Sequence, residues 1–223
     1  MLYDETAVRA NIRNRDGKRV FYLRSGDTLT PLARDFLRQE HIEVLPAQEA
    51  KPKGYRLLSG GYTEEKPEHM THLNGDVLVP KTHPRIRFRG MIDSLEAELL
   101  LCGPETGEIL QLARRLIRCD VLDEPVGDFT LYGLTAQQQR QHSHFPQDYY
   151  GIPHFMPDYA DGEQVLRLNR CRSVCRQAEL SAVEAFSDKD GNLTRGDIVQ
   201  ALNRMSSMLY ILMIRRKRTD GKH

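Results

Sequence analysis

The segment 163–187 has a helical pattern with charged side chains in the middle of an apolar stripe. At about 100° per residue, Arg172, Arg176 and Glu179 fall in line with one another. Two guanidinium groups one turn apart can hold a polyphosphate, whereas burying them unpaired costs several kcal/mol. The pattern indicates either a phosphate site or a set of i,i+3 ion pairs on the surface. The stripe also contains Val165, Leu168, Val183 and Phe186.

Two further helical segments place polar groups among apolar ones. On segment 195–215, Asn203 shares a stripe with Ser206, Ser207 and Tyr210. On segment 85–102, Asp93 lies in line with Ile86, Ala97 and Leu100, so we expect its carboxylate to enter an apolar face and meet an arginine. Polar groups in such helices need partners in the bundle or in a ligand. Three helices with polar centres could close on one site.

Cations and a turn precede the first of these helices. Thr71 and His72 are followed by Asn74-Gly75, and then by Lys81 and Arg85. A glycine-containing turn with nearby cations can wrap a triphosphate through backbone N–H groups and side chains. A simple β-hairpin turned by Asn-Gly explains the same residues.

Metal ligation finds little support in the pattern of histidines and cysteines. The pairs His69/His72 and His142/His144 are not completed by a Cys or acidic cluster. Cys171 and Cys175 are four residues apart on a helix, a spacing that allows chelation, but packing is favoured. His154 either lines a ligand cavity or lies on the surface. We predict no resident metal.

The elements that must position these residues are mainly helices. We expect them at about 85–102, 105–121, 163–187 and 195–215, with stop signals at Gly103-Pro104 and at the turn 188–192. Thr135-x-x-Gln138 can cap a shorter helix. We expect residues 1–50 to form a small α+β segment, with a helix that starts at Thr30-Pro31. Residues 51–70 are expected to form a linker or loop, and residues 71–218 a helical bundle.

Composition limits the partners and the compartment. Lysine and arginine number 32 and aspartate and glutamate 31, which argues against nucleic acid as a partner. No export signal is expected at the N-terminus, and the most apolar run, 198–214, is too short and polar for a membrane span. Cys102 and Cys119 lie in apolar-patterned segments, typical of reduced thiols. We expect a cytoplasmic protein.

Several motifs, taken in their order and spacing, resemble the corrinoid adenosyltransferases of the ethanolamine-utilization type, which are related to the propanediol-utilization type. The likeness covers nearly the whole chain and includes a leading segment at 29–34. The motifs are Thr71-His72-Leu73, His83-Pro84-Arg85-Ile86, Arg89-Gly90-Met91-Ile92-Asp93-Ser94, Asp123-Glu124-Pro125, Ser143-His144-Phe145-Pro146, His154-x-x-Pro157, Arg172-x-x-x-Arg176-x-x-Glu179 and Gln200-Ala201-Leu202-Asn203-Arg204-Met205-Ser206-Ser207.

The resemblance implies a mainly α protein with a five-helix bundle whose active sites lie between subunits of a homo-oligomer, a trimer being favoured over a dimer. It implies transfer of the 5′-deoxyadenosyl group of ATP, with Mg²⁺, to cob(I)alamin for ethanolamine utilization. It implies a reductase and ethanolamine ammonia-lyase as partners. The protein would be associated with a bacterial microcompartment. The residues implied to contact ATP are Thr71, His72, Lys81, Arg85, Arg172, Arg176, Glu179 and Asn203.

Catalytic and corrinoid-contacting roles follow from the same resemblance. Arg172, Arg176 and Asp93 would be catalytic, with Asp93 pairing with Arg172 across the subunit interface. An apolar wall under the corrin would help to remove the lower axial ligand of Co(II). The candidates for corrinoid contact are Phe145, Tyr149, His154, Phe155 and Met156.

One departure from the family bears on metals. Some members carry a His followed by Cys-Cys-x-x-Cys before the Thr-His-Leu motif, and this cluster binds a divalent transition metal. Residues 51–68 contain neither Cys nor His here, so no structural iron or zinc is expected. Two other functions remain open: a non-catalytic corrinoid carrier that delivers adenosylcobalamin to a lyase, and a helical scaffold. A carrier would not need Arg172, Arg176, Glu179 and Asn203.

Overall fold

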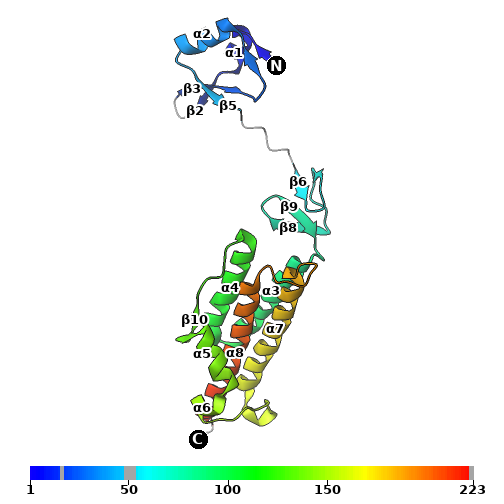
Figure 1. Ribbon diagram of the computed structural model, residues 1–223, viewed down its shortest axis with the longest axis vertical. Coiled ribbons are helices and arrows are strands. Elements are labelled where there is room, and N and C mark those ends of the chain that lie inside the picture. Colours follow the sequence, from blue (N-terminus) through cyan, green and yellow to red (C-terminus); the bar gives the residue numbers. More distant parts are fainter. Residues whose placement is uncertain (16–17, 48–53, 221–223) are drawn as a thin grey trace. The chain divides into compact units, whose positions relative to one another are not determined.

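A computed structural model of the protein describes residues 1–15, 18–47 and 54–220. The chain divides into two compact units, Met1–Gly54 and Tyr55–His223. The second unit contains the long helices, shown in green to red in Figure 1. The fold is mainly helical, as the sequence predicted. Within the described ranges, no helix has both the length and the apolar character needed to cross a bilayer.

The first unit is a small α+β structure. Its helix α2 begins after Thr30, whose side chain accepts a hydrogen bond from the N–H of Ala33, so the predicted start is confirmed. Strands β1 and β4 pair in parallel, while β3 pairs with β2 and β5. The elements are β1 (Leu2–Tyr3), α1 (Glu5–Asn11), β2 (Arg13–Arg15), β3 (Lys18–Leu23), β4 (Thr28–Leu29), α2 (Pro31–Gln39) and β5 (Glu43–Pro46).

A four-stranded sheet opens the second unit, in the order β7-β6-β9-β8. Its strands are β6 (Tyr55–Leu57), β7 (Tyr62–Thr63), β8 (Met70–Asn74) and β9 (Val77–Pro80). Gly75, at φ 49°, turns β8 into β9, which confirms the hairpin. The linker predicted over 51–70 is wrong where β6 and β7 stand, because β6 is held by pairing with β9, about twenty residues away. Residues 51–53 lie outside the described residues.

Four long helices and a shorter one form the bundle. The long ones are α3 (Pro84–Cys102), α4 (Gly107–Leu122), α7 (Glu163–Phe186) and α8 (Gly196–Asp220), and the shorter one is α5 (Ala136–His144). α7 packs between α3 and α8, and α5 packs along α8 (Figure 1). The predicted helix positions are confirmed to within a turn, except that α8 continues to Asp220, beyond the predicted end at 215. The Thr135–Gln138 capping box is present at the start of α5.

Shorter elements lie between the long helices, most of them in the connection from α4 to α7. Strands β10 (Thr130–Leu131) and β11 (Leu134–Thr135) form a hairpin before α5. Helix α6 (Pro146–Tyr150) follows α5, and the 3₁₀ helices η1 (Pro104–Thr106) and η2 (Tyr159–Asp161) precede α4 and α7. This connection brings residues 143–157 against α8, where the site lies.

Apolar residues at spacings of three and four make the bundle core. On α3 the buried face contains Phe88, Ile92, Leu95 and Leu99, each 0% exposed. On α8 every residue from Met208 to Ile214 is buried, and α5, α6 and α7 pack against this helix. The four cysteines are free and buried, so Cys102 and Cys119 pack as small apolar side chains, as expected, and so do Cys171 and Cys175.

Candidate functional site

The charged part of the α7 stripe borders a hollow of about 610 Å³. Val165, Leu168 and Phe186, at the ends of the stripe, are buried in the core, whereas Arg172 is half-buried and Arg176 is exposed. The two arginines thus face the hollow and not the core. It is lined by Ser143, His144, His154, Phe155, Met156, Pro157, Asn169, Arg172, Arg176, Asn203, Ser206, Ser207, Tyr210 and Met213.

The polar stripe of α8 forms another wall of this hollow. Asn203, Ser206, Ser207 and Tyr210 all border it, so the polar groups that interrupt this apolar helix meet at one place. Ser206 and Tyr210 are 6% and 8% exposed. Their position agrees with the expectation that such groups serve a partner in the bundle or a ligand.

Arg172 lies in an electrostatically unfavourable position. Its guanidinium carbon is 5.5 Å from the centre of the Tyr210 ring, a cation–π contact. Burial, followed by the charge of Arg176, lowers the pKa of Arg172. In the described part of the chain, neither Arg172 nor Arg176 forms an ion pair with a carboxylate. Two adjacent cations without a counter-ion are a suitable receptor for a polyanion.

His154 is held by both ring nitrogens at the edge of the hollow. Nε2 lies 3.0 Å from the carbonyl oxygen of His144, which can only accept, so this nitrogen carries the proton. Nδ1, 3.1 Å from the Tyr210 hydroxyl, then accepts. The same hydroxyl accepts the N–H of Phe155 at 3.1 Å. Neither nitrogen of His154 is therefore free to coordinate a metal.

An apolar rim surrounds the mouth of the hollow. Phe155 packs on the Tyr210 ring with a centroid separation of 5.7 Å, and Met156 is 89% exposed. Of the five residues predicted to contact the corrinoid, His154, Phe155 and Met156 line the hollow. Phe145 and Tyr149 do not: Phe145 is 59% exposed, and Tyr149 stacks on His142 at 3.8 Å.

A second hollow, of about 450 Å³, adjoins the first and shares His144 and Asn203 with it. Across its wall, Asn203 donates from Nδ2 to Glu179 at 2.8 Å and accepts from Arg204 Nη2 at 2.7 Å. Glu179 of α7 and Asn203 of α8, both predicted to contact ATP, therefore lie together in the structure. The lining residues are Arg140, His144, Glu179, Gly196, Val199, Gln200, Asn203 and Arg204.

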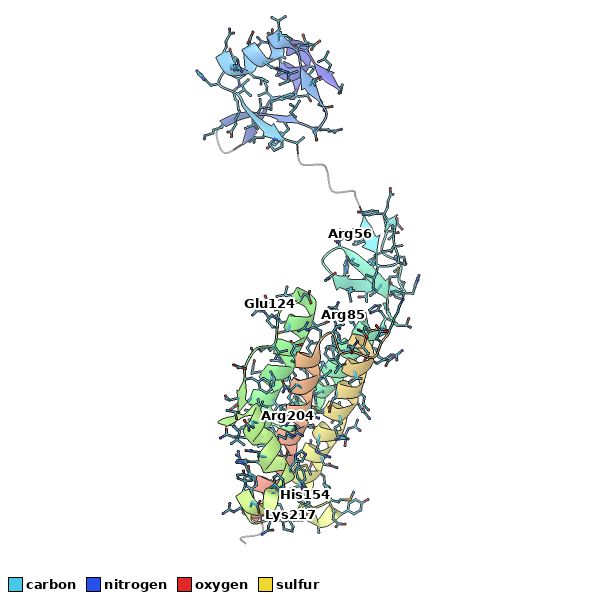
Figure 2. All side chains as sticks on the ribbon, in the orientation of Figure 1. Arg56, Arg85, Glu124, His154, Arg204 and Lys217 are labelled. Carbon is cyan, nitrogen blue, oxygen red and sulfur yellow. The ribbon has the colours of Figure 1, made fainter. Side chains whose placement is uncertain are left out.

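The structure does not bring the other predicted ATP contacts to either hollow within one chain. Thr71 and His72 lie on β8, and Lys81 follows β9 and pairs with Glu68 at 3.2 Å. Figure 2 places Arg85 at the end of the bundle near this sheet, and His154 toward the opposite end. The expected set is therefore divided into two groups.

Within one chain, Arg85 pairs with a buried carboxylate. Its Nε donates to Oδ1 of Asp120 at 2.8 Å, and Nε of Arg89 donates to Oδ2 at 2.6 Å. Asp120 is 0% exposed, so two guanidinium groups neutralise a fully buried carboxylate. This pair of ion pairs holds α3 to α4, and contact of Arg85 with ATP stays a prediction.

Asp93 is exposed, and the prediction that it enters an apolar core and meets an arginine is wrong within one chain. The helix α3 has two apolar faces, and the one that contains Phe88, Ile92 and Leu95 is buried. The face with Asp93, Ala97 and Leu100 is opposite and exposed, Leu100 to 59%. Helical spacing alone could not say which of these faces packs.

Among the ionisable residues that border the hollows, sequence reasoning assigned no role to Arg140, His144 and Arg204. Arg204 carried a signal, since a charged residue in the apolar run of α8 needs a reason. Arg140 and His144 are four residues apart on α5, a spacing that puts them on one face of the helix. The neighbouring sequence contains no signal that this face packs beside α8. Among described residues, no group of three His, Cys, Asp or Glu is placed to hold a metal.

Comparison with known proteins agrees with this arrangement. Residues 61–216, which include the sheet and the bundle, match the family described as Cobalamin adenosyltransferase. The Corrinoid adenosyltransferase EutT of Salmonella typhimurium (strain LT2) is 31% identical over 94% of this chain and 90% of its own length. The protein of the same name from Escherichia coli (strain K12) is 29% identical over the same shares.

Proposed function

Since this chain belongs to the cobalamin adenosyltransferase family, we propose that it transfers the 5′-deoxyadenosyl group of ATP to reduced cobalamin for ethanolamine utilization. The observation that supports this most directly is the hollow beside α7 and α8. It combines two arginines without carboxylate partners among the described residues with a rim of Phe155, Met156 and Tyr210. A polyanion and a large planar ring system are the reactants that such a surface suits.

The reaction needs little acid–base chemistry from the protein. Cobalt(I) is the nucleophile: its electron pair forms the bond to the 5′-carbon, and the carbon–oxygen bond breaks with its pair leaving on triphosphate. The protein must bring cobalt and carbon together in line and neutralise charge on the leaving group. Arg172 and Arg176 are the catalytic candidates for that second task, because they are fixed on one helix beside the hollow.

The bonds of His154 support a corrinoid wall that offers no ligand to cobalt. Both nitrogens of His154 are used by protein partners, and its neighbours Phe155 and Met156 are apolar. An apolar wall with no donor favours cobalamin without a lower axial ligand, and removing that ligand makes Co(II) easier to reduce. Phe145, the exposed residue that follows α5, would extend this wall, because the corrin ring is larger than the area that Phe155 and Met156 cover.

Magnesium would be bound with the nucleotide. Mg²⁺ prefers carboxylate and phosphate oxygens, and Glu179 is a carboxylate that lines the smaller hollow. Its Oε1 accepts from Asn203. Glu179 and the phosphates of ATP would hold the ion, which would supply further neutralisation of the leaving group.

The divided set of ATP contacts supports a homo-oligomer. Thr71, His72 and Lys81, on the small sheet of one copy, would complete the hollow of another, and the exposed Asp93 would pair with a neighbour's Arg172. A trimer is favoured over a dimer. A reductase that supplies Co(I) and an ethanolamine ammonia-lyase that uses the product would be its partners, in the cytoplasm or at a bacterial microcompartment.

The test is spectral conversion of reduced cobalamin to adenosylcobalamin with ATP and Mg²⁺. Arg176→Ala should lower the rate by about 100-fold or more, because a charge-neutralising group is lost in the transition state. Arg118→Ala, which removes an exposed arginine of α4, is the matched control and should keep full activity. No conversion by the wild type under strong reduction, with binding of cobalamin retained, would instead indicate a carrier.

A further inference from the structure

The smaller hollow contains two arginines to which the reaction as described assigns no role. Arg140 extends from α5 and Arg204 from α8. Several arginines of the bundle are paired with carboxylates, such as Arg87 with Glu184 and Arg170 with Glu98. Among the residues that the structure describes, Arg140 and Arg204 have no such partner.

Arg204 forms no ion pair with the one carboxylate of its hollow, Glu179, among the described residues. Its Nε is buried and has no hydrogen-bond partner among the described residues, and Nη2 donates to the neutral Oδ1 of Asn203 at 2.7 Å. Burial, and then the charge of Arg140, lowers the pKa of Arg204. A half-buried guanidinium that faces another cation is costly unless an acceptor with negative charge completes it.

The protein supplies too little negative charge to meet this need. Among the described residues that line either hollow, the one carboxylate is Glu179, in the smaller hollow, against Arg140, Arg172, Arg176 and Arg204. One oxygen of Glu179 is already occupied by Asn203. The two hollows are continuous at His144 and Asn203, so an extended anion can reach all four guanidinium groups.

We propose that Arg140 and Arg204 form a polyphosphate subsite that holds the phosphate groups farthest from the transferred adenosyl group. This inference rests on the proposed adenosyl transfer. It divides the site by chemistry: the larger hollow, with its apolar rim and with Arg172 and Arg176, takes the corrinoid, the adenosyl group and the nearest phosphate, and the smaller hollow takes the farthest phosphates. The occupant is either the tail of bound ATP or the triphosphate that remains after transfer.

The experiment measures binding of tripolyphosphate, ATP and adenosine to the full chain by isothermal titration calorimetry at constant ionic strength. Arg140→Gln and Arg204→Gln should each weaken tripolyphosphate binding by about tenfold or more, since each removes charge-assisted hydrogen bonds. Adenosine should bind as to the wild type. Arg118→Gln controls for the loss of one positive charge far along the exposed face of α4.

ATP affinity distinguishes the two sources of the phosphate chain. If the subsite holds the tail of ATP, both variants weaken ATP to the same extent as tripolyphosphate. If it holds only the product, ATP affinity is kept, and inhibition of turnover by added tripolyphosphate is relieved in the variants. Unchanged tripolyphosphate affinity in both variants overturns the proposal.

Two features keep the result interpretable. Arg140 is exposed, so its substitution does not threaten folding, and Arg204→Lys keeps the charge if Arg204→Gln unfolds. If the wild type binds tripolyphosphate but makes no adenosylcobalamin, the proposed function is wrong and the proposed anion site stands. If the wild type makes adenosylcobalamin and both variants bind tripolyphosphate as the wild type does, only the proposed subsite is wrong.

Discussion

At the scale of single residues, the Tyr210 hydroxyl joins α8 to the segment that follows α6. It accepts the N–H of Phe155 and donates to Nδ1 of His154, each at 3.1 Å. Tyr210→Phe leaves both groups without that partner, so we expect the free energy of unfolding to fall by about 1–3 kcal/mol. Because the apolar wall then loosens, the KM for cobalamin should rise while the affinity for ATP is kept.

Denaturant unfolding and steady-state kinetics check the Tyr210 prediction. Tyr159→Phe is the matched control, because that side chain is 93% exposed and its loss of a hydroxyl should change neither quantity. A Tyr210→Phe protein with wild-type stability and wild-type KM for cobalamin would show that these hydrogen bonds do not hold the wall.

A second residue-scale prediction concerns pH. Burial, followed by the charge of Arg215, lowers the pKa of His142 in the folded protein. The unfolded chain, with an ordinary histidine pKa of about 6.5, therefore binds this proton more tightly. The stability contributed by a neutral His142 is present above that pH and falls as the pH drops toward the lower folded pKa.

Denaturant unfolding at about pH 7.5 and pH 5 should show a smaller loss of stability in His142→Gln than in the wild type. His83, whose pKa burial also lowers, is present in both proteins, so the difference isolates His142. An NMR titration that gave His142 a pKa above the ordinary histidine value would contradict the reasoning.

At the scale of elements, Asp120 determines how α3 and α4 are held together. Its carboxylate is fully buried and receives Arg85 and Arg89 from the first two turns of α3. Asp120→Asn removes the charge and leaves two partly buried cations, so the free energy of unfolding should fall by about 3–5 kcal/mol. Asp123→Asn, at an 86% exposed carboxylate, should change it little.

Thermal and denaturant unfolding measure this effect, and ATP binding at low temperature separates it from a phosphate-binding role for Arg85. Arg85→Gln should likewise destabilise the fold while the folded fraction keeps its ATP affinity. Loss of ATP affinity without loss of stability in Arg85→Gln would restore Arg85 as a nucleotide contact.

How far the sequence predicts an element depends on the range of the interactions that determine it. Thr30, the Thr135–Gln138 box and Gly103-Pro104 act on their own helix ends, so the helix limits could be read directly. The pairing of β6 with β9, the burial of Asp120 and the meeting of Arg140 with Arg204 depend on residues far apart in the chain. A periodic pattern carries no information about these long-range partners.

At the scale of the whole molecule, two features support the proposed homo-oligomer. Leu100, Leu101 and Leu180 on α3 and α7 are 59%, 69% and 71% exposed, and apolar side chains of this size on packed helices commonly mark an interface. The residues expected to bind ATP are divided between the small sheet and the α7/α8 hollow. An oligomer in which the sheet of one copy reaches the hollow of the next explains both.

Complementation between two inactive variants tests this arrangement. Lys81→Ala removes a cation beside the sheet, and Arg176→Ala removes one from the hollow, so each oligomer should be inactive alone. When equal amounts are unfolded together and refolded, about a quarter of the sites should combine an intact sheet with an intact hollow from different copies. Activity should therefore return to about a quarter of the wild type, whereas variants refolded separately and then mixed stay inactive. If sheet and hollow act within one chain, every site carries one defect, and co-refolding restores nothing.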